Sequence, residues 1–112
     1  MSELYEVKIT SQAQEQMAEI IDYISYDLCA PEAADSLLNK LENRIMALSK
    51  FPERYQLIDE EPWKTEGIRK ILVNNFLVYY WIDKAKRVVH VTAVIYEKRN
   101  QLEQLKRIIP DS

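Results

Sequence analysis

Two runs of β-forming residues, separated only by Asn74-Asn75, constrain this chain more than any other feature. The runs "IRKILV" and "FLVYYWI" are rich in β-branched and aromatic residues, and an asparagine pair tolerates the positive φ of a tight turn. The sequence therefore predicts a β-hairpin. Apart from Arg69 and Lys70, the side chains of both of its faces are apolar, so both faces must be covered.

Two further segments have the alternating pattern of a strand. The segment "LYEVKIT" near the N-terminus alternates apolar and charged residues, which predicts a half-buried strand. The segment "VVHVTAVIY", residues 88–96, follows the turn "DKAKR". Strict alternation along this last strand predicts two sets of side chains, one on each face: Val89, Val91, Ala93 and Ile95 against Val88, His90, Thr92, Val94 and Tyr96.

Two amphipathic helices are expected between the first strand and the hairpin. Ser11 is the expected N-cap of the first helix, which ends near Cys29. Pro31 suits the first turn of the second helix, and Pro52 stops it. Because only two or three residues separate the helices, they must form an antiparallel hairpin. Helical spacing puts six apolar residues of the second helix on one stripe: Ala34, Leu37, Leu38, Leu41, Ile45 and Leu48.

The remaining segments complete the expected fold. Residues 56–66, "QLIDEEPWKTE", are expected to form a polar, solvated loop, and "NQLEQLKRII" a short C-terminal helix. The predicted class is α+β, a single domain over residues 1–112 with element order β-α-α-β-β-β. A helical hairpin packs on a mostly antiparallel four-stranded sheet. Only the C-terminal helix is left to cover the second face, so a partner chain is expected to cover the rest.

Composition narrows the classes of function. The chain has one cysteine and one glycine, no apolar run near the roughly 20 residues that span a bilayer, and no signal-peptide pattern. These features predict a cytoplasmic protein without a membrane segment, an internal disulfide or a phosphate loop. His, Cys, Asp and Glu have no metal-ligand spacing, so we expect neither a metal nor another cofactor.

Charge is distributed unevenly along the chain. Residues 1–61 carry five Lys or Arg against thirteen Asp or Glu, whereas residues 62–112 carry ten against five. If the strands pair in register, cations and tyrosines of the basic half meet at one sheet edge, where they would suit a phosphate. The alternative is that cations end strands only because strands end in water. The residues concerned are Arg69, Lys70, Tyr79, Tyr80, Tyr96, Lys98 and Arg99.

Taken together, the segments "SKFPERYQL", "GIRKILVNNFLVYYWID" and "VTAVIYEKRNQLEQL" resemble the RelE/ParE superfamily of toxins from type II toxin-antitoxin systems. The resemblance extends from about Tyr5 to Lys106. It implies a small cytoplasmic toxin that a cognate antitoxin neutralises by wrapping around it. The antitoxin would then be the partner that covers the second face of the sheet, with contacts expected at Leu77, Trp81, Leu102 and Leu105.

The resemblance also implies two possible targets. RelE-like members cleave mRNA on the ribosome without a metal, whereas ParE-like members poison DNA gyrase. By position, Arg69 would hold the scissile phosphate, Arg99 would stabilise the transition state, and Tyr96 stands where many relatives carry histidine. In either case, target contacts are expected from Lys70, Tyr79 and Lys98.

Two departures from the RelE pattern favour the gyrase poison slightly. The segment after Arg99 contains no Tyr or His to transfer a proton, and an unperturbed tyrosine such as Tyr96 is a reluctant base. The sequence pI of about 5.2 also disfavours binding to ribosomal RNA. A RelE-like endonuclease, a non-toxic relative that only binds partners, and an unrelated α+β domain stay open, as does the oligomeric state.

Overall fold

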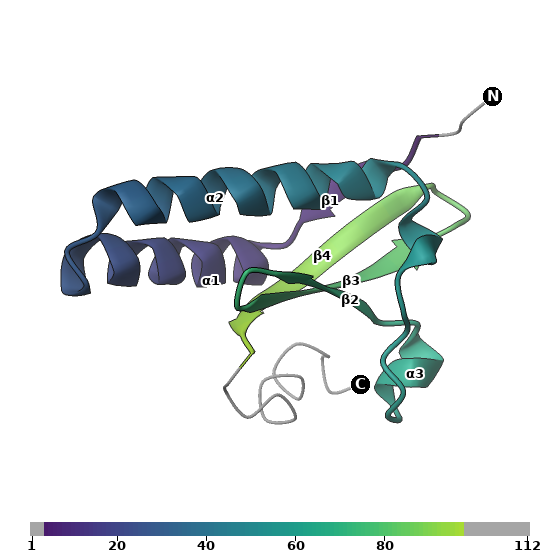
Figure 1. The fold of residues 1–112 in the computed structure, drawn as a ribbon. Coiled ribbons are helices and arrows are strands. Elements are labelled where there is room, and N and C mark those ends of the chain that lie inside the picture. The colour runs from purple at the N-terminus through teal and green to yellow at the C-terminus, as the bar shows by residue number, and fades with distance from the viewer. Residues whose placement is uncertain (1–3, 98–112) are drawn as a thin grey trace.

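A four-stranded sheet carries two long helices on one face in the computed structural model, which describes residues 4–97 (Figure 1). The predicted α+β class and its element order are confirmed, while the predicted C-terminal helix lies outside the described residues. The elements are β1 (Glu6–Ile9), α1 (Ser11–Asp22), α2 (Pro31–Met46), α3 (Trp63–Glu66), β2 (Arg69–Val73), β3 (Phe76–Asp83) and β4 (Val88–Tyr96).

The two long helices form the expected antiparallel hairpin (Figure 1). The expected N-cap at Ser11 is wrong: Thr10 is the cap, and its hydroxyl oxygen accepts a hydrogen bond from the Ala13 N–H at 3.2 Å. Beyond α1 the chain continues through a π-helical turn, Tyr23–Asp27, and reverses at Cys29, whose φ is 52°. Pro31 then opens α2, where its missing N–H costs no hydrogen bond.

The sheet is mixed, with strand order β1-β4-β3-β2. β2, β3 and β4 pair antiparallel, and β1 pairs in parallel with β4. Asn74 takes the positive φ expected of the hairpin turn, 54°. Because β2 and β4 are both antiparallel to β3, they run in the same direction.

A bulge in β4 overturns the strict alternation expected from the sequence. Tyr79 pairs with Ala93 but Tyr80 pairs with Val91, so Thr92 has no opposite residue in β3. One extra residue reverses the facing of every side chain beyond it. Val94 therefore packs on the helix side with Val91, while Ala93 and the residues in step with it turn to the second face.

Each face of the sheet has its own core. The helix-side cluster joins the stripes of α1 and α2 to the sheet. On the second face, Ile58, Trp63 and Ile68 pack against strand residues of β3 and β4. The expectation of a solvated loop there is wrong, because residues 56–66 supply buried anchors among their polar residues. Their spacing fits neither a helix nor a strand, so no periodicity revealed them.

Candidate functional site

A turn after α2 is hydrogen-bonded to the middle of the sheet. Phe51 adopts a left-handed conformation, with φ 48° and ψ 54°, and the 3₁₀ turn Pro52–Arg54 follows it. The hydroxyl of fully buried Tyr80 donates a hydrogen bond to the Pro52 carbonyl at 2.7 Å. Burial raises the pKa of Tyr80 well above its usual range, and the nearby Arg69 charge opposes this only in part. Tyr80 is therefore a neutral anchor for the turn.

Arg69, the first residue of β2, is hydrogen-bonded to the same turn. One nitrogen of its guanidinium, Nη1, donates to the carbonyl of Glu53 at 3.1 Å and also to the carbonyl of Tyr55. The Glu53 carboxylate is directed elsewhere, since it pairs with Lys84 at 2.7 Å, and this hydrogen bond lowers the pKa of Glu53. A guanidinium that satisfies two backbone carbonyls is held in place by them. The sequence resemblance implied a phosphate contact for Arg69, which stays a prediction; in the structure its Nη1 contacts these two carbonyls.

The sheet register does not bring Arg69 and Tyr96 together. Arg69 lies opposite Tyr80, whereas Tyr96 lies opposite Phe76, which in turn lies opposite Val73. Four residues of strand separate the two levels, roughly 13 Å along the strand direction. The expectation of a shared edge assumed that the start of β2 and the end of β4 meet. Because these strands run in the same direction, the two positions lie toward opposite ends of the sheet. Arg99 lies outside the described residues.

Two of the three residues expected to contact a target, Lys70 and Tyr79, lie within the described residues. Tyr79 has no exposed surface and belongs to the second-face cluster with Trp63, so the structure places it as a core residue. Its position in a central strand explains this, and burial raises the pKa of Tyr79 to about 12. Lys70 is half-buried on β2. Lys98 lies outside the described residues.

The residues expected to contact an antitoxin divide in the same way. Leu77 is 6% exposed, because the residues around Trp63 already cover it. Trp81 is half-buried and stacks on His90, with ring centroids 4.4 Å apart and planes 18° from parallel. Leu102 and Leu105 lie outside the described residues.

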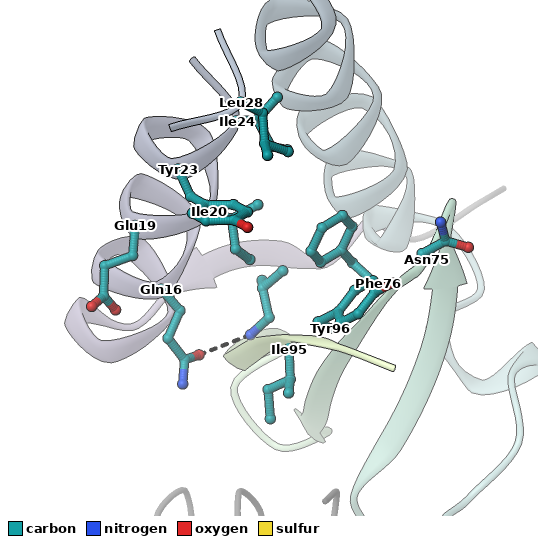
Figure 2. A pocket seen from close by; sticks show the side chains of 11 residues that line it. Gln16, Glu19, Ile20, Tyr23, Ile24, Leu28, Asn75, Phe76, Ile95 and Tyr96 are labelled. Atoms are coloured by element: carbon teal, nitrogen blue, oxygen red, sulfur yellow. Dashed lines mark hydrogen bonds between the residues drawn. The ribbon is translucent and has the colours of Figure 1, made fainter. Parts of the chain in front are cut away.

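A groove that the sequence did not reveal lies on the other side of the sheet, between α1 and the neighbouring ends of β3 and β4. Its volume is about 800 Å³. Figure 2 shows the paired rings of Phe76 and Tyr96, 5.5 Å apart, on one wall, with Ile24 and Leu28 from the helical hairpin on another. The Gln16 side-chain oxygen closes the base by accepting a hydrogen bond from the Val94 N–H at 2.9 Å.

The groove continues onto the tip of the helical hairpin. Tyr23 and Leu28 line it and are 54% and 55% exposed, and Tyr26 beside them in the chain is 75% exposed. A run of large exposed apolar side chains commonly marks a contact surface. The sequence carried a signal for it, since apolar residues continue at helical spacing from Ile20 through Ile24 to Leu28, beyond the end of α1 at Asp22.

Within residues 4–97, no group of three or more His, Cys, Asp or Glu side chains is placed to hold a metal ion. In the same range, no helix is long and apolar enough to cross a membrane.

Solved structures of toxin-antitoxin proteins have a similar fold. A chain of the chromosomal ParDE toxin-antitoxin system of P. aeruginosa matches with a TM-score of 0.68 and 16% identity, covering 85% of this chain and 98% of that one. A double-arginine mutant of E. coli RelE in its free state matches with a TM-score of 0.64 and 15% identity, over 95% and 99% of the two chains. A chain of the RelBE2 toxin-antitoxin complex of Mycobacterium tuberculosis matches with a TM-score of 0.59 and 18% identity, over 83% and 91%.

Comparison by sequence identifies the family of the chain. No curated protein sequence matches the chain significantly. A family model, described as the ParE toxin of the type II toxin-antitoxin system parDE, matches residues 7–101 and so covers most of the chain. The chain therefore belongs to the ParE toxin family, within the RelE/ParE superfamily of type II toxin-antitoxin toxins.

Proposed function

We propose that this toxin inhibits growth in the cytoplasm by poisoning DNA gyrase. The observation that carries the proposal is the engagement of Arg69 by the turn carbonyls, at a distance from Tyr96 along the sheet. Cleavage of RNA by its own 2′-hydroxyl needs groups that take and give a proton close to a phosphate-binding cation. Arg69 and Tyr96 do not form such a pair, and the match to the ParE family points the same way.

A second function has support from the fold alone. The free RelE structure matches 95% of this chain, so a RelE-like, metal-independent endonuclease acting on ribosome-bound mRNA is the alternative target mode. Arg99 would then be its principal cation, and Tyr96 would have to transfer the proton.

The experiment that separates these functions is expression of the chain alone, with mRNA integrity and DNA breaks followed in one culture. Gyrase poisoning predicts DNA breaks and filamentation with intact mRNA. The purified chain should also inhibit supercoiling and trap gyrase–DNA cleavage complexes. Rapid codon-biased mRNA cleavage with intact DNA would overturn the proposal in favour of the endonuclease. Normal growth at full expression would leave a relative that only binds partners.

The cognate antitoxin is proposed to bind in the groove between α1 and the ends of β3 and β4. An apolar face of an antitoxin helix suits a groove lined by Ile24, Leu28 and Phe76. Leu28→Glu places a charge in this groove, whereas Leu72→Glu alters a side chain of similar exposure, 49%, on edge strand β2. We expect Leu28→Glu to weaken antitoxin binding by at least about tenfold and Leu72→Glu to leave it unchanged. Equal effects of the two changes would exclude the groove.

A further inference from the structure

The outer side of the Pro52–Arg54 turn holds a cluster of cations around one phenol. The Arg54 nitrogen Nη2 donates a hydrogen bond to the Tyr55 hydroxyl at 3.0 Å, and its guanidinium carbon lies 4.9 Å from the Tyr55 ring centroid. Arg44 approaches the same hydroxyl from the last turn of α2. Arg54 is exposed, and the other two residues are half-buried. Two guanidinium groups from separate elements therefore converge on a site open to solvent.

The Tyr55 hydroxyl responds to these charges. Burial raises the pKa of Tyr55, but hydrogen bonding and the charges of Arg54 and Arg44 outweigh it and lower the pKa below its usual value. Since the Tyr55 oxygen accepts from Arg54, its own proton is free to be donated. A phenol polarised in this way is a stronger hydrogen-bond donor to an anion.

No carboxylate within residues 4–97 neutralises this cluster. Neither Arg44 nor Arg54 forms an ion pair in that range, and Glu53, the one acid of the turn, is already paired with Lys84. Like charges held close together repel each other, and the overall net charge of −3 makes an uncompensated cationic cluster more unusual. An anion from outside the chain would relieve the repulsion.

We propose that Arg44, Arg54 and the Tyr55 hydroxyl bind a phosphate group of a nucleic-acid backbone. A tetrahedral phosphate accepts hydrogen bonds from several directions, as donors from a helix, a turn and a phenol require, whereas a carboxylate accepts within one plane. The site lies near the Arg69 level of the sheet and away from the groove at Tyr96, so an antitoxin segment bound in that groove would leave it open. The inference goes beyond the choice of target, because gyrase-bound DNA and ribosome-bound mRNA both present such phosphates.

The test measures binding of the purified full chain to a short labelled DNA duplex and to a single-stranded RNA by fluorescence anisotropy over a series of salt concentrations. Arg44→Gln and Arg54→Gln should each weaken binding and reduce the slope of log K against log salt concentration by about one. Tyr55→Phe should weaken binding without changing that slope, since it removes a neutral donor. The nucleic acid that binds more tightly shows whether the phosphate belongs to DNA or to RNA.

The matched control is Lys8→Gln, which removes one exposed positive charge on β1, at the opposite edge of the sheet. It should change neither affinity nor slope. If Lys8→Gln has the same effect as Arg54→Gln, binding follows overall charge and the proposal fails. The proposal also fails if an acidic peptide binds the wild-type chain in a manner lost with Arg54→Gln while neither nucleic acid binds. Because gyrase and ribosomes are absent, these results do not depend on the proposed function.

A measurement on the unaltered chain guards against variants that fail to fold. In NMR spectra of the chain with labelled tyrosines, inorganic phosphate should shift the ring signals of Tyr55 at concentrations where those of exposed Tyr23 stay unchanged. Chloride at the same ionic strength is the control, and it should not reproduce the shift. Equal shifts with acetate, or no shift with phosphate, would overturn the proposal.

Discussion

The two faces of the sheet are covered in different ways. On one face, α1 and α2 lay continuous apolar stripes on the strands, and residues such as Leu41 and Ile45 are completely buried. On the other face, residues 56–68 contribute a few anchors and a helix of only four residues. Both covers exclude water: Trp63, the largest anchor, is 6% exposed. Equal burial is therefore reached by a regular element on one side and by single side chains on the other.

This difference has an energetic consequence. Burial on the helix side is spread over many similar residues, each replaceable in part by its neighbours. Burial on the second face depends mainly on Trp63, whose ring packs in one cluster with Leu77 and Tyr79. One substitution should therefore uncover much of the second face, while no single substitution should uncover the first.

Trp63→Ala should give the largest effect, a loss of about 3–5 kcal/mol in the free energy of unfolding. Leu41→Ala on the helix side is the comparison and should cost about 2–5 kcal/mol. Denaturant titration measures both losses. Hydrogen exchange should show faster exchange for Trp63→Ala first at Ile58 and Ile68, whose backbones are hydrogen-bonded to each other at 2.9 Å. A loss well under 1 kcal/mol for Trp63→Ala would mean that the loop only rests on the sheet.

Arg69→Ala tests how much stability comes from the hydrogen bonds between β2 and the turn that precedes residues 56–68. The carbonyls of exposed Glu53 and of half-buried Tyr55 would lose a charged donor, so we expect a loss of about 1–3 kcal/mol. Thermal unfolding measures it, and Lys84→Ala, which breaks only an exposed ion pair, is the control with an expected loss under about 1 kcal/mol.

The same Arg69→Ala variant bears on function. If Arg69 acts only by fastening the turn, toxicity should fall in proportion to the loss of folded protein and should return at lower temperature. Complete loss of toxicity in a variant as stable as the wild type would restore Arg69 as a residue that contacts the target.

The contrast between the covers explains how much of the fold was predictable. Helical spacing in "LLNKLENRIMAL" comes from a regular element that buries one side, and the run of β-forming residues in "FLVYYWI" comes from a strand that is buried on both faces. The fold class, the positions of the strands and the hairpin turn were therefore predicted correctly. Trp63 and Ile58 cover the sheet, but their spacing along the sequence follows no helix or strand period. They were therefore not predicted to be core residues. The bulge at Thr92 was also invisible, because it depends on pairing between strands and not on the strand's own sequence.

The candidate site was less predictable than the fold. Arg69 and Tyr96 were grouped because both flank strands, but the direction of β2 relative to β4 decides which strand ends meet, and only the sheet order supplies it. Arg44 was counted only among the charges, and Arg54 only contributed to the resemblance of "SKFPERYQL", so neither was predicted to bind anything. They converge on Tyr55 because the turn after α2 brings the chain back beside the helix end, which spacing along the sequence does not show.

The pH dependence of stability also compares the two faces of the sheet, because Tyr79 packs on the face covered by residues 56–68 and Tyr80 on the face covered by the helices. Burial raises the pKa of Tyr79 from 10 to about 12 in the folded chain. The stability that this burial contributes is fully present below pH 10 and is lost as the pH rises from 10 to 12. Stability should therefore fall over this window, and Tyr79→Phe should make the fall shallower. Denaturant titrations at several pH values measure the slope, and an unchanged slope would mean that Tyr79 ionises without unfolding.

Gly67→Ala should give the smallest effect and tests whether the loop cover is held in its conformation by its own backbone. Gly67 ends α3 with φ 76°, and its N–H donates to the Lys64 carbonyl at 3.1 Å. An added Cβ would meet no atom within 4 Å, so the cost comes from the left-handed backbone alone, about 1 kcal/mol. Gly67→Asn should cost less, because asparagine tolerates this conformation. If both changes cost as much as Trp63→Ala, the cover would depend on the exact path of its backbone. A small cost for both means instead that Trp63 holds the cover in place.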